Sequence, residues 1–132
     1  MSSYGRAAQQ YLQTQVRSST PLELVVMLYD AALRASATAA DAMIRRDIPT
    51  RRTALSRTMA IVGELQSTLD MDKGGAIAVE LDRLYSWMMS QLVDATVRQD
   101  AKPIQDVHKT LAILHDGWSQ IATAQPAPES AA

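Results

Sequence analysis

The segment whose residue types come nearest to a metal site is 70–75, with the sequence DMDKGG. Aspartates at its first and third positions and a glycine at its sixth match the start of an EF-hand calcium loop. The match then ends, because Gly74 stands where an oxygen ligand belongs and Leu81 stands where the loop needs a bidentate glutamate. The pattern therefore predicts no calcium site.

The histidines and glutamates do not form a catalytic or metal-binding set either. His108 and His115 are seven residues apart, too far for one ion without further ligands. A di-iron bundle needs Glu-x-x-His pairs, and the chain has none. It also has no cysteine, no serine nucleophile elbow and no phosphate-binding glycine loop. We therefore expect a protein that is not an enzyme and uses no cofactor.

Five arginines crowd one short stretch, namely Arg45, Arg46, Arg51, Arg52 and Arg57. The first two suit the negative C-terminal end of one helix, whereas Arg51 and Arg52 lie near the positive end of the next. The cluster is either a solvated charged turn or a docking patch for an acidic partner. The formal net charge of −1 argues against a dedicated nucleic-acid binder.

Composition favours a single helical domain. The chain has 132 residues, and its five glycines and five prolines cluster at a few points. The first residues lack the apolar stretch of a secretory signal, and no apolar run approaches the ~20 residues of a membrane span. We expect a cytoplasmic protein, or one exported by a route that uses no such signal, and in either case one that does not insert into a membrane.

Four helices are predicted from the breaks between them. The first begins at 20–23, TPLE, which reads as a capping box, and it ends before 47–49, where Asp47 is expected to cap the second helix. The third follows the break at 70–75, and the fourth follows the turn at 100–103. Short connections predict an all-α fold, an antiparallel four-helix bundle over residues 20–124.

Each predicted helix has an apolar seam in steps of three and four residues. The seams are Leu22, Val25, Tyr29, Ala32, Ser36, Ala39 and Met43 in the first helix; Leu55, Thr58, Val62, Leu65 and Leu69 in the second; Ile77, Leu81, Leu84, Met88, Gln91 and Ala95 in the third; and Ile104, Val107, Leu111, Leu114, Trp118 and Ile121 in the fourth.

A second apolar row lies beside two of the seams. Tyr85, Met89 and Val93 flank the third seam, and Ile61 flanks Leu65 in the second. A bundle helix needs an apolar stripe only a little over ~100° wide, so these residues exceed what a core requires. They either complete an irregular core or form a binding strip, which Met89 and its methionine neighbours would make adaptable. Weak self-association of the free protein through this strip is left open.

The two ends of the chain are predicted to lie outside the bundle. Residues 1–19 hold Tyr4, Tyr11, Leu12 and Val16, which are too sparse for a bundle helix. This segment is either a frayed tail or a lid over the apolar strip. Residues 125–132 have nothing to bury, and we expect them to be a disordered tail.

Three segments resemble a known family. Residues 19–30, STPLELVVMLYD, are similar to the opening of the bacterial flagellar secretion chaperones that bind flagellin. Residues 63–75, GELQSTLDMDKGG, and 81–88, LDRLYSWM, resemble their central region in the same order and spacing. The likeness extends from about Tyr4 to Trp118. The chain departs from the family at Ala31-Ala32, where a glycine is usual, and at Gln15, where asparagine is common.

The resemblance implies an antiparallel bundle that holds the disordered C-terminal segment of flagellin until export through the flagellar type III apparatus. It also implies that the loaded chaperone meets the export gate, and that an N-terminal segment covers part of the binding surface. Carried over by position, the lid contacts are Tyr4 and Tyr11. The groove residues are Ile61, Leu65, Leu69, Leu81, Leu84 and Tyr85.

Two other functions fit the residues less well. The first is a helical adaptor or regulatory protein that binds a different amphipathic peptide. The second is a nucleic-acid binder that uses the arginine cluster and would show steeply salt-dependent binding. Failure to bind a flagellin C-terminal peptide would favour the adaptor.

Overall fold

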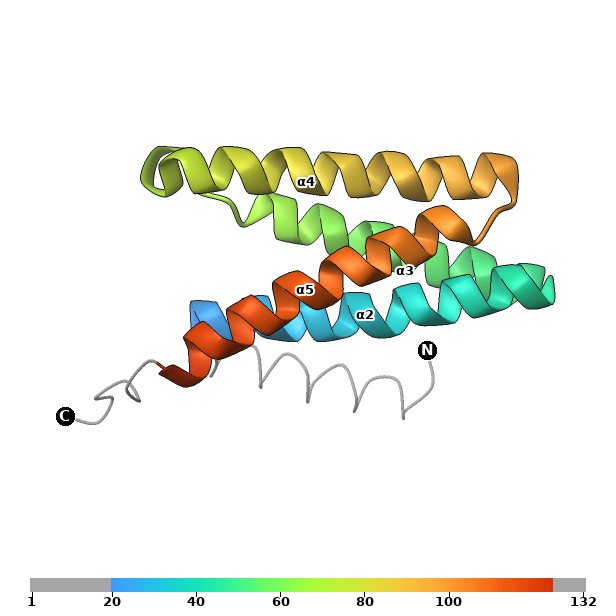
Figure 1. Ribbon diagram of the computed structural model, residues 1–132, viewed down its shortest axis with the longest axis horizontal. Helices are drawn as coiled ribbons and strands as arrows, with labels where there is room; N and C mark the ends of the chain where they lie inside the picture. Colours follow the sequence, from blue (N-terminus) through green and yellow to red (C-terminus); the bar gives the residue numbers. More distant parts are fainter. Residues whose placement is uncertain (1–19, 125–132) are drawn as a thin grey trace, which may run out of the picture.

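The computed structural model describes residues 20–124, which form four α-helices joined by short connections. These are α2 (Pro21–Arg45), α3 (Ile48–Ser67), α4 (Met71–Arg98) and α5 (Lys102–Ala124). Consecutive helices run in opposite directions (Figure 1). Residues 20–124 contain no strand. The predicted all-α, antiparallel four-helix bundle is therefore confirmed.

Polar side chains fix the starts of α2 and α3. Thr20 Oγ1 and Asp47 Oδ1 each accept a hydrogen bond from the backbone N–H three residues later, at 3.1 and 3.3 Å. Such bonds satisfy N–H groups that have no partner within their own helix. Both starts agree with the sequence prediction.

The start of α4 differs from the prediction. Asp70 Oδ1 accepts hydrogen bonds from the backbone N–H groups two and three residues later, at 3.1 and 2.9 Å, so the helix begins at Met71. Gly75 then interrupts it with φ of 55° and ψ of −133° before regular helix resumes. The prediction that this helix follows Gly75 was wrong, because the aspartate that resembled a calcium ligand serves as a helix cap.

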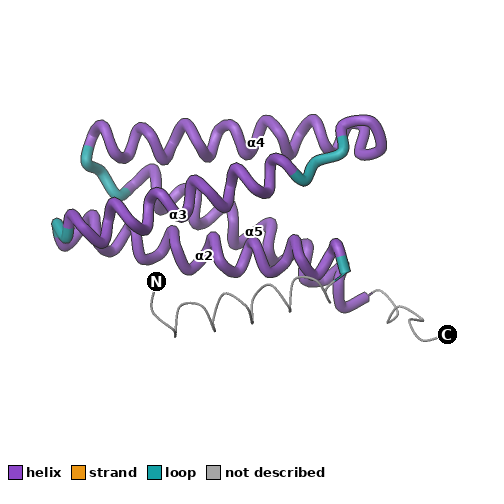
Figure 2. The backbone as a smooth tube through the Cα atoms, turned by 180° about the vertical axis from the view of Figure 1, so that it is seen from behind, coloured by secondary structure: helices purple, strands orange, loops and turns teal. Residues whose placement is uncertain are grey.

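Helix α2 is the most deeply packed of the four. It contacts both α3 and α5, while α4 lies on the other side of these two helices (Figures 1 and 2). Its buried face is largely alanine: Ala32, Ala35, Ala39, Ala40 and Ala42. Small side chains let neighbouring helix axes come close, so α2, α3 and α5 form a tight unit.

The predicted seams supply most of the core. Buried members include Tyr29, Leu55, Val62, Leu65, Met88, Ala95, Ile104, Val107 and Leu111. Two predicted seam residues, Ile77 of α4 and Ile121 of α5, are instead exposed. Both lie where α4 and α5 separate at one end of the bundle (Figure 1). None of the described helices combines the length and apolar character needed to cross a membrane.

Candidate partner-binding site

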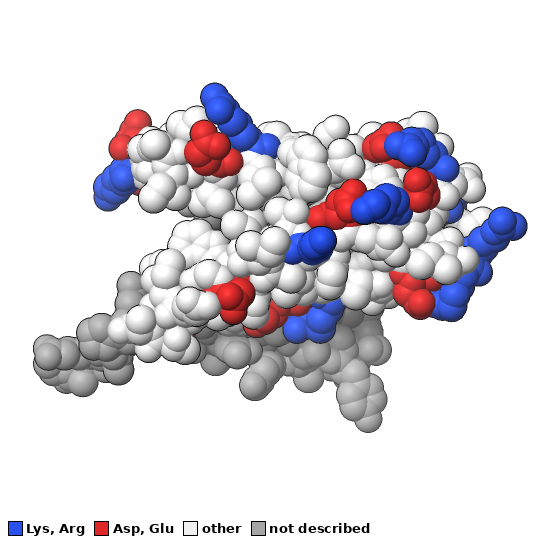
Figure 3. All heavy atoms as spheres, viewed as in Figure 1, with Lys and Arg blue, Asp and Glu red and all other residues white. Residues whose placement is uncertain are grey.

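An apolar hollow opens between the N-terminal half of α4 and α5. It has a volume of about 370 Å³ and is lined by Ala76, Ile77, Glu80, Leu81 and Leu84 of α4 and Leu114 of α5. Figure 3 shows the surface hollowed between these two helices, with uncharged residues on most of the visible wall. Such a contiguous apolar concavity is typical of a site where another molecule docks.

One side of the hollow is held in place by contacts between α3 and α4. The Gln66 amide of α3 donates hydrogen bonds to Asp82 Oδ1 at 2.8 Å and to Ser86 Oγ at 3.0 Å. Both acceptors lie on α4, in the same stretch of helix as the hollow. The N-terminal half of α4 is therefore fastened to α3.

The opposite side is held by contacts between α5 and α2. His115 Nε2 lies 2.6 Å from Asp30 Oδ1, and Ser36 Oγ lies 2.9 Å from His108 Nδ1. Both pairs join α2 to α5, which gives the two histidines a structural role. Helix α4 is held against α3, whereas α5 is held against α2. Helices α4 and α5 therefore separate at this end, and the hollow is the space between them.

Two adjacent glycines shape the end of α4 beside the hollow. A Cβ on Gly74 would lie 2.6 Å from the Cβ of Ala78, so the first turn packs too closely for a larger residue. Gly75 adopts a positive φ that other residues rarely adopt. After this kink Ile77 is 70% exposed, although it lines the hollow.

A buried tyrosine pair lies next to the hollow. The hydroxyl groups of Tyr29 of α2 and Tyr85 of α4 are 2.6 Å apart and join two helices on opposite sides of the bundle. Burial raises the pKa of both hydroxyls above 10.0. The hydrogen bond with Tyr85 partly offsets this effect on the pKa of Tyr29. Because Tyr85 follows Leu84, this bond also fixes one wall of the hollow.

The structure separates the predicted groove residues into two groups. Leu65 and Tyr85 belong to the core, with 0% and 2% exposure. Tyr85 is therefore not part of a surface strip, because its ring points inward and its hydroxyl is bonded to Tyr29. The remaining predicted residues are half-buried against the core: Ile61, Leu69, Leu81, Leu84 and Met89. Of these, Leu81 and Leu84 line the hollow.

Sequence reasoning assigned four lining residues to other roles or passed over them. Ile77 and Leu114 were assigned to core seams, Glu80 was weighed only as a metal ligand, and Ala76 was given no role. The kinked glycine pair just before Ile77 is a signal that the seam does not begin there. The predicted lid residues Tyr4, Tyr11, Leu12 and Val16 lie outside the described residues.

Within residues 20–124 no cluster of three or more His, Asp or Glu side chains could hold a metal ion. The remaining chemistry of the site is apolar contact, with the Glu80 carboxylate at its edge. The hollow is thus suited to bind an apolar side chain or a helical face.

The chain matches known flagellar proteins along most of its length. The family model described as flagellar protein FliS matches residues 4–125. The flagellar secretion chaperone FliSB of Pseudomonas aeruginosa is 32% identical over 89% of this chain and 96% of its own length. The flagellar secretion chaperone FliS of Salmonella typhimurium is 34% identical over 93% of this chain and 92% of its own. The chain therefore belongs to the FliS family of flagellar proteins.

Proposed function

We propose that this protein is a cytoplasmic export chaperone that binds the C-terminal segment of flagellin, prevents its premature polymerisation and delivers it to the flagellar type III export apparatus. The observation that carries the proposal is the apolar hollow between α4 and α5. The names of the relatives from Pseudomonas aeruginosa and Salmonella typhimurium, both flagellar secretion chaperones, support it.

The apolar wall suits a client segment that folds as it binds. Such a segment loses conformational entropy on docking, and burial of apolar surface must offset this loss. Ile77, at 70% exposure, has most of its side chain still to bury. Full burial of a side chain of this size contributes roughly 1.5–3 kcal/mol. Several such contacts over an interface of about 2,000 Å² would hold the segment.

The proposed contacts begin at the hollow. Ile77, Leu81, Leu84 and Leu114 form its apolar lining, and the half-buried Ile61, Leu69 and Met89 offer further surface if the client extends along the bundle. A lid formed by the N-terminal segment and a handover at the export gate are part of the same proposal. Release there requires a competing partner, since the sequence has no nucleotide-binding motif.

Two variants of α4 test the proposal. Ile77 and Val97 are both β-branched, are 70% and 77% exposed and belong to the same helix, but only Ile77 lines the hollow. Ile77→Asn should weaken binding of a flagellin C-terminal peptide about tenfold, because an unpaired amide is then desolvated. Val97→Asn should leave the affinity unchanged. Isothermal titration calorimetry measures both, and circular dichroism checks that each variant is folded.

Equal affinity of the two variants would place the client elsewhere on the bundle. If the unmodified protein does not bind the flagellin peptide at all, the chaperone proposal fails, and the adaptor for a different amphipathic peptide becomes the better reading.

A further inference from the structure

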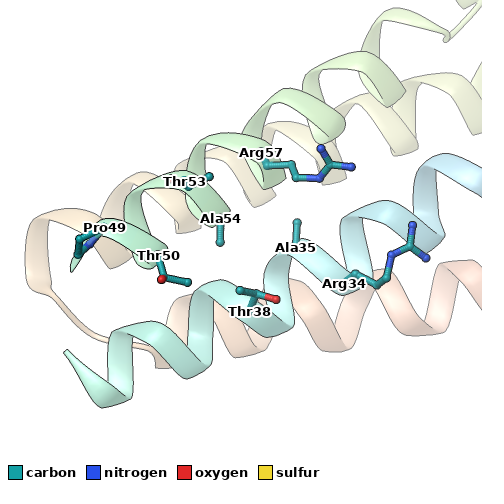
Figure 4. Close-up of a pocket in the computed structure, with 8 residues that line it drawn as sticks. All are labelled: Arg34, Ala35, Thr38, Pro49, Thr50, Thr53, Ala54 and Arg57. Atoms are coloured by element: carbon teal, nitrogen blue, oxygen red, sulfur yellow. The ribbon is translucent and has the colours of Figure 1, made fainter. Parts of the chain in front are cut away.

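A second groove lies between α2 and α3, away from the helix pair that forms the hollow. It has a volume of about 450 Å³ and is lined by Arg34, Ala35, Thr38, Pro49, Thr50, Thr53, Ala54 and Arg57. Ala35 and Ala54 form a buried apolar floor. Figure 4 shows Arg34 and Arg57 together at one end of the groove, with the proline and the threonines toward the other.

The two arginines at this end have no acidic partner among residues 20–124. The ion pairs in this part of the chain involve Arg45, Arg83, Arg98, Lys102 and His115. No acidic residue lines the groove. Two cations facing one groove raise its positive potential, and a carboxylate placed between them would form charge-assisted hydrogen bonds.

On the α3 side, the surroundings of the groove add to its positive charge. Helix α3 contains a single acidic residue, Glu64, which is about two turns beyond Arg57. Arg51 and Arg52 lie in the first turns of α3, where the helix dipole is already positive. The cations of the groove therefore favour an external anion.

The groove favours a protein segment over a nucleic acid. Its floor and walls are alanine, proline and threonine, which suit small aliphatic side chains, and no aromatic residue is present on which a base could stack. The chain's own residues 1–19 are not complementary, because they contain two arginines and no acidic residue. Residues 1–19 are therefore not the occupant.

We infer that the α2–α3 groove binds an acidic segment of a partner protein. Aliphatic side chains of that segment lie over Ala35 and Ala54, and a carboxylate lies between Arg34 and Arg57. The groove belongs to α2 and α3, whereas the hollow belongs to α4 and α5, so this second surface does not depend on the client occupying the first.

The full-length protein and a pair of probe peptides test this assignment. One fluorescein-labelled peptide combines Ala and Leu with Glu, and its control has Gln in place of every Glu. Fluorescence anisotropy should show that the Glu peptide binds at least about tenfold more tightly than the Gln peptide. The double variant Arg34→Gln/Arg57→Gln should lose about tenfold or more of the affinity for the Glu peptide.

A matched double variant controls for overall charge. Lys73 and Lys109 are exposed, have no ion pair within the described residues and lie outside the groove. Lys73→Gln/Lys109→Gln removes the same charge and should leave the affinity within about twofold. Thr53→Phe, an exposed change that fills the groove without altering charge, should also weaken binding. Circular dichroism verifies that all three variants are folded.

Three outcomes would overturn the assignment. The two double variants could lose affinity for the Glu peptide equally, which would mean that the overall positive charge of the protein attracts the peptide and that the groove is not a specific binding site. The Thr53→Phe variant could bind the Glu peptide normally, which would place the peptide outside the groove. A single-stranded oligonucleotide could bind more tightly than the Glu peptide and lose its affinity in the Arg34→Gln/Arg57→Gln variant, which would make the occupant a nucleic acid.

Discussion

The tyrosine pair at the centre of the bundle predicts a non-additive response to removal of its hydroxyl groups. The Tyr29 and Tyr85 oxygens are 2.6 Å apart in the core, and one hydroxyl donates a hydrogen bond to the other. Each hydroxyl is therefore the partner that satisfies the other inside the bundle.

Each single substitution should be costly. Tyr85→Phe and Tyr29→Phe each remove the hydrogen bond and leave the other buried hydroxyl without its partner. Each should cost about 2–3 kcal/mol, which for a chain of this size lowers Tm by about 10 °C.

The double variant gives the sharper test. Once Tyr29 is phenylalanine, removal of the unpaired Tyr85 hydroxyl should restore about 1 kcal/mol of the free energy of unfolding. The double variant should therefore be more stable than Tyr29→Phe alone. Urea denaturation followed by circular dichroism measures all three free energies of unfolding, provided the m-value stays constant. Additive costs in the double variant would refute the hydrogen-bonded pair.

Three further predictions concern the helix ends and the response to pH. Gly75→Ala should destabilise the protein by about 1–3 kcal/mol because of its positive φ, whereas Gly117→Ala, in open space on α5, should stabilise it by up to about 1 kcal/mol; thermal melts compare the two. Hydrogen bonds from Thr50 lower the pKa of Asp47, so its contribution to stability is present above the ordinary value of 3.8 and lost as pH falls through the lowered pKa. Asp47→Asn still caps the helix and should show a shallower loss of Tm in acid. Burial raises the pKa of Tyr29 and Tyr85, so their contribution is complete below pH 10.0 and lost as pH rises further. Tyrosinate absorbance from this pair should then appear together with loss of the helical circular dichroism signal.

Local signals in the sequence predicted most of the fold. Thr20 and Asp47 are good capping residues placed just before prolines that suit a first helical turn, so two helix starts could be read directly. The seam through Val62 and Leu65 is also the observed buried face. The start of α4 was misplaced because a glycine pair usually ends a helix. Here Gly75 forms a kink within a helix already capped by Asp70.

The candidate site was less predictable because it depends on contacts between helices. The periodicity of α4 places Ile77 on the same seam as Met88, yet Met88 is buried and Ile77 is exposed. The difference in exposure arises because Gln66 holds this half of α4 against α3, while α5 is held against α2. Tyr85 was assigned to the surface for the converse reason, since its partner Tyr29 lies 56 residues away along the chain.

Amide hydrogens of a native protein exchange with solvent through openings that range from local fraying to global unfolding. In α2 the buried alanines pack against helices on two sides, so its central amides should exchange only when the whole bundle unfolds. Before Tyr85, α4 buries only Ala78, so the turns that precede the Gln66–Asp82 contact should open more easily than the rest of the helix. Protection should therefore rise along α4 from Ile77 to Leu92. The end of the bundle that contains the hollow is then also the end that adapts most readily to the shape of a bound partner.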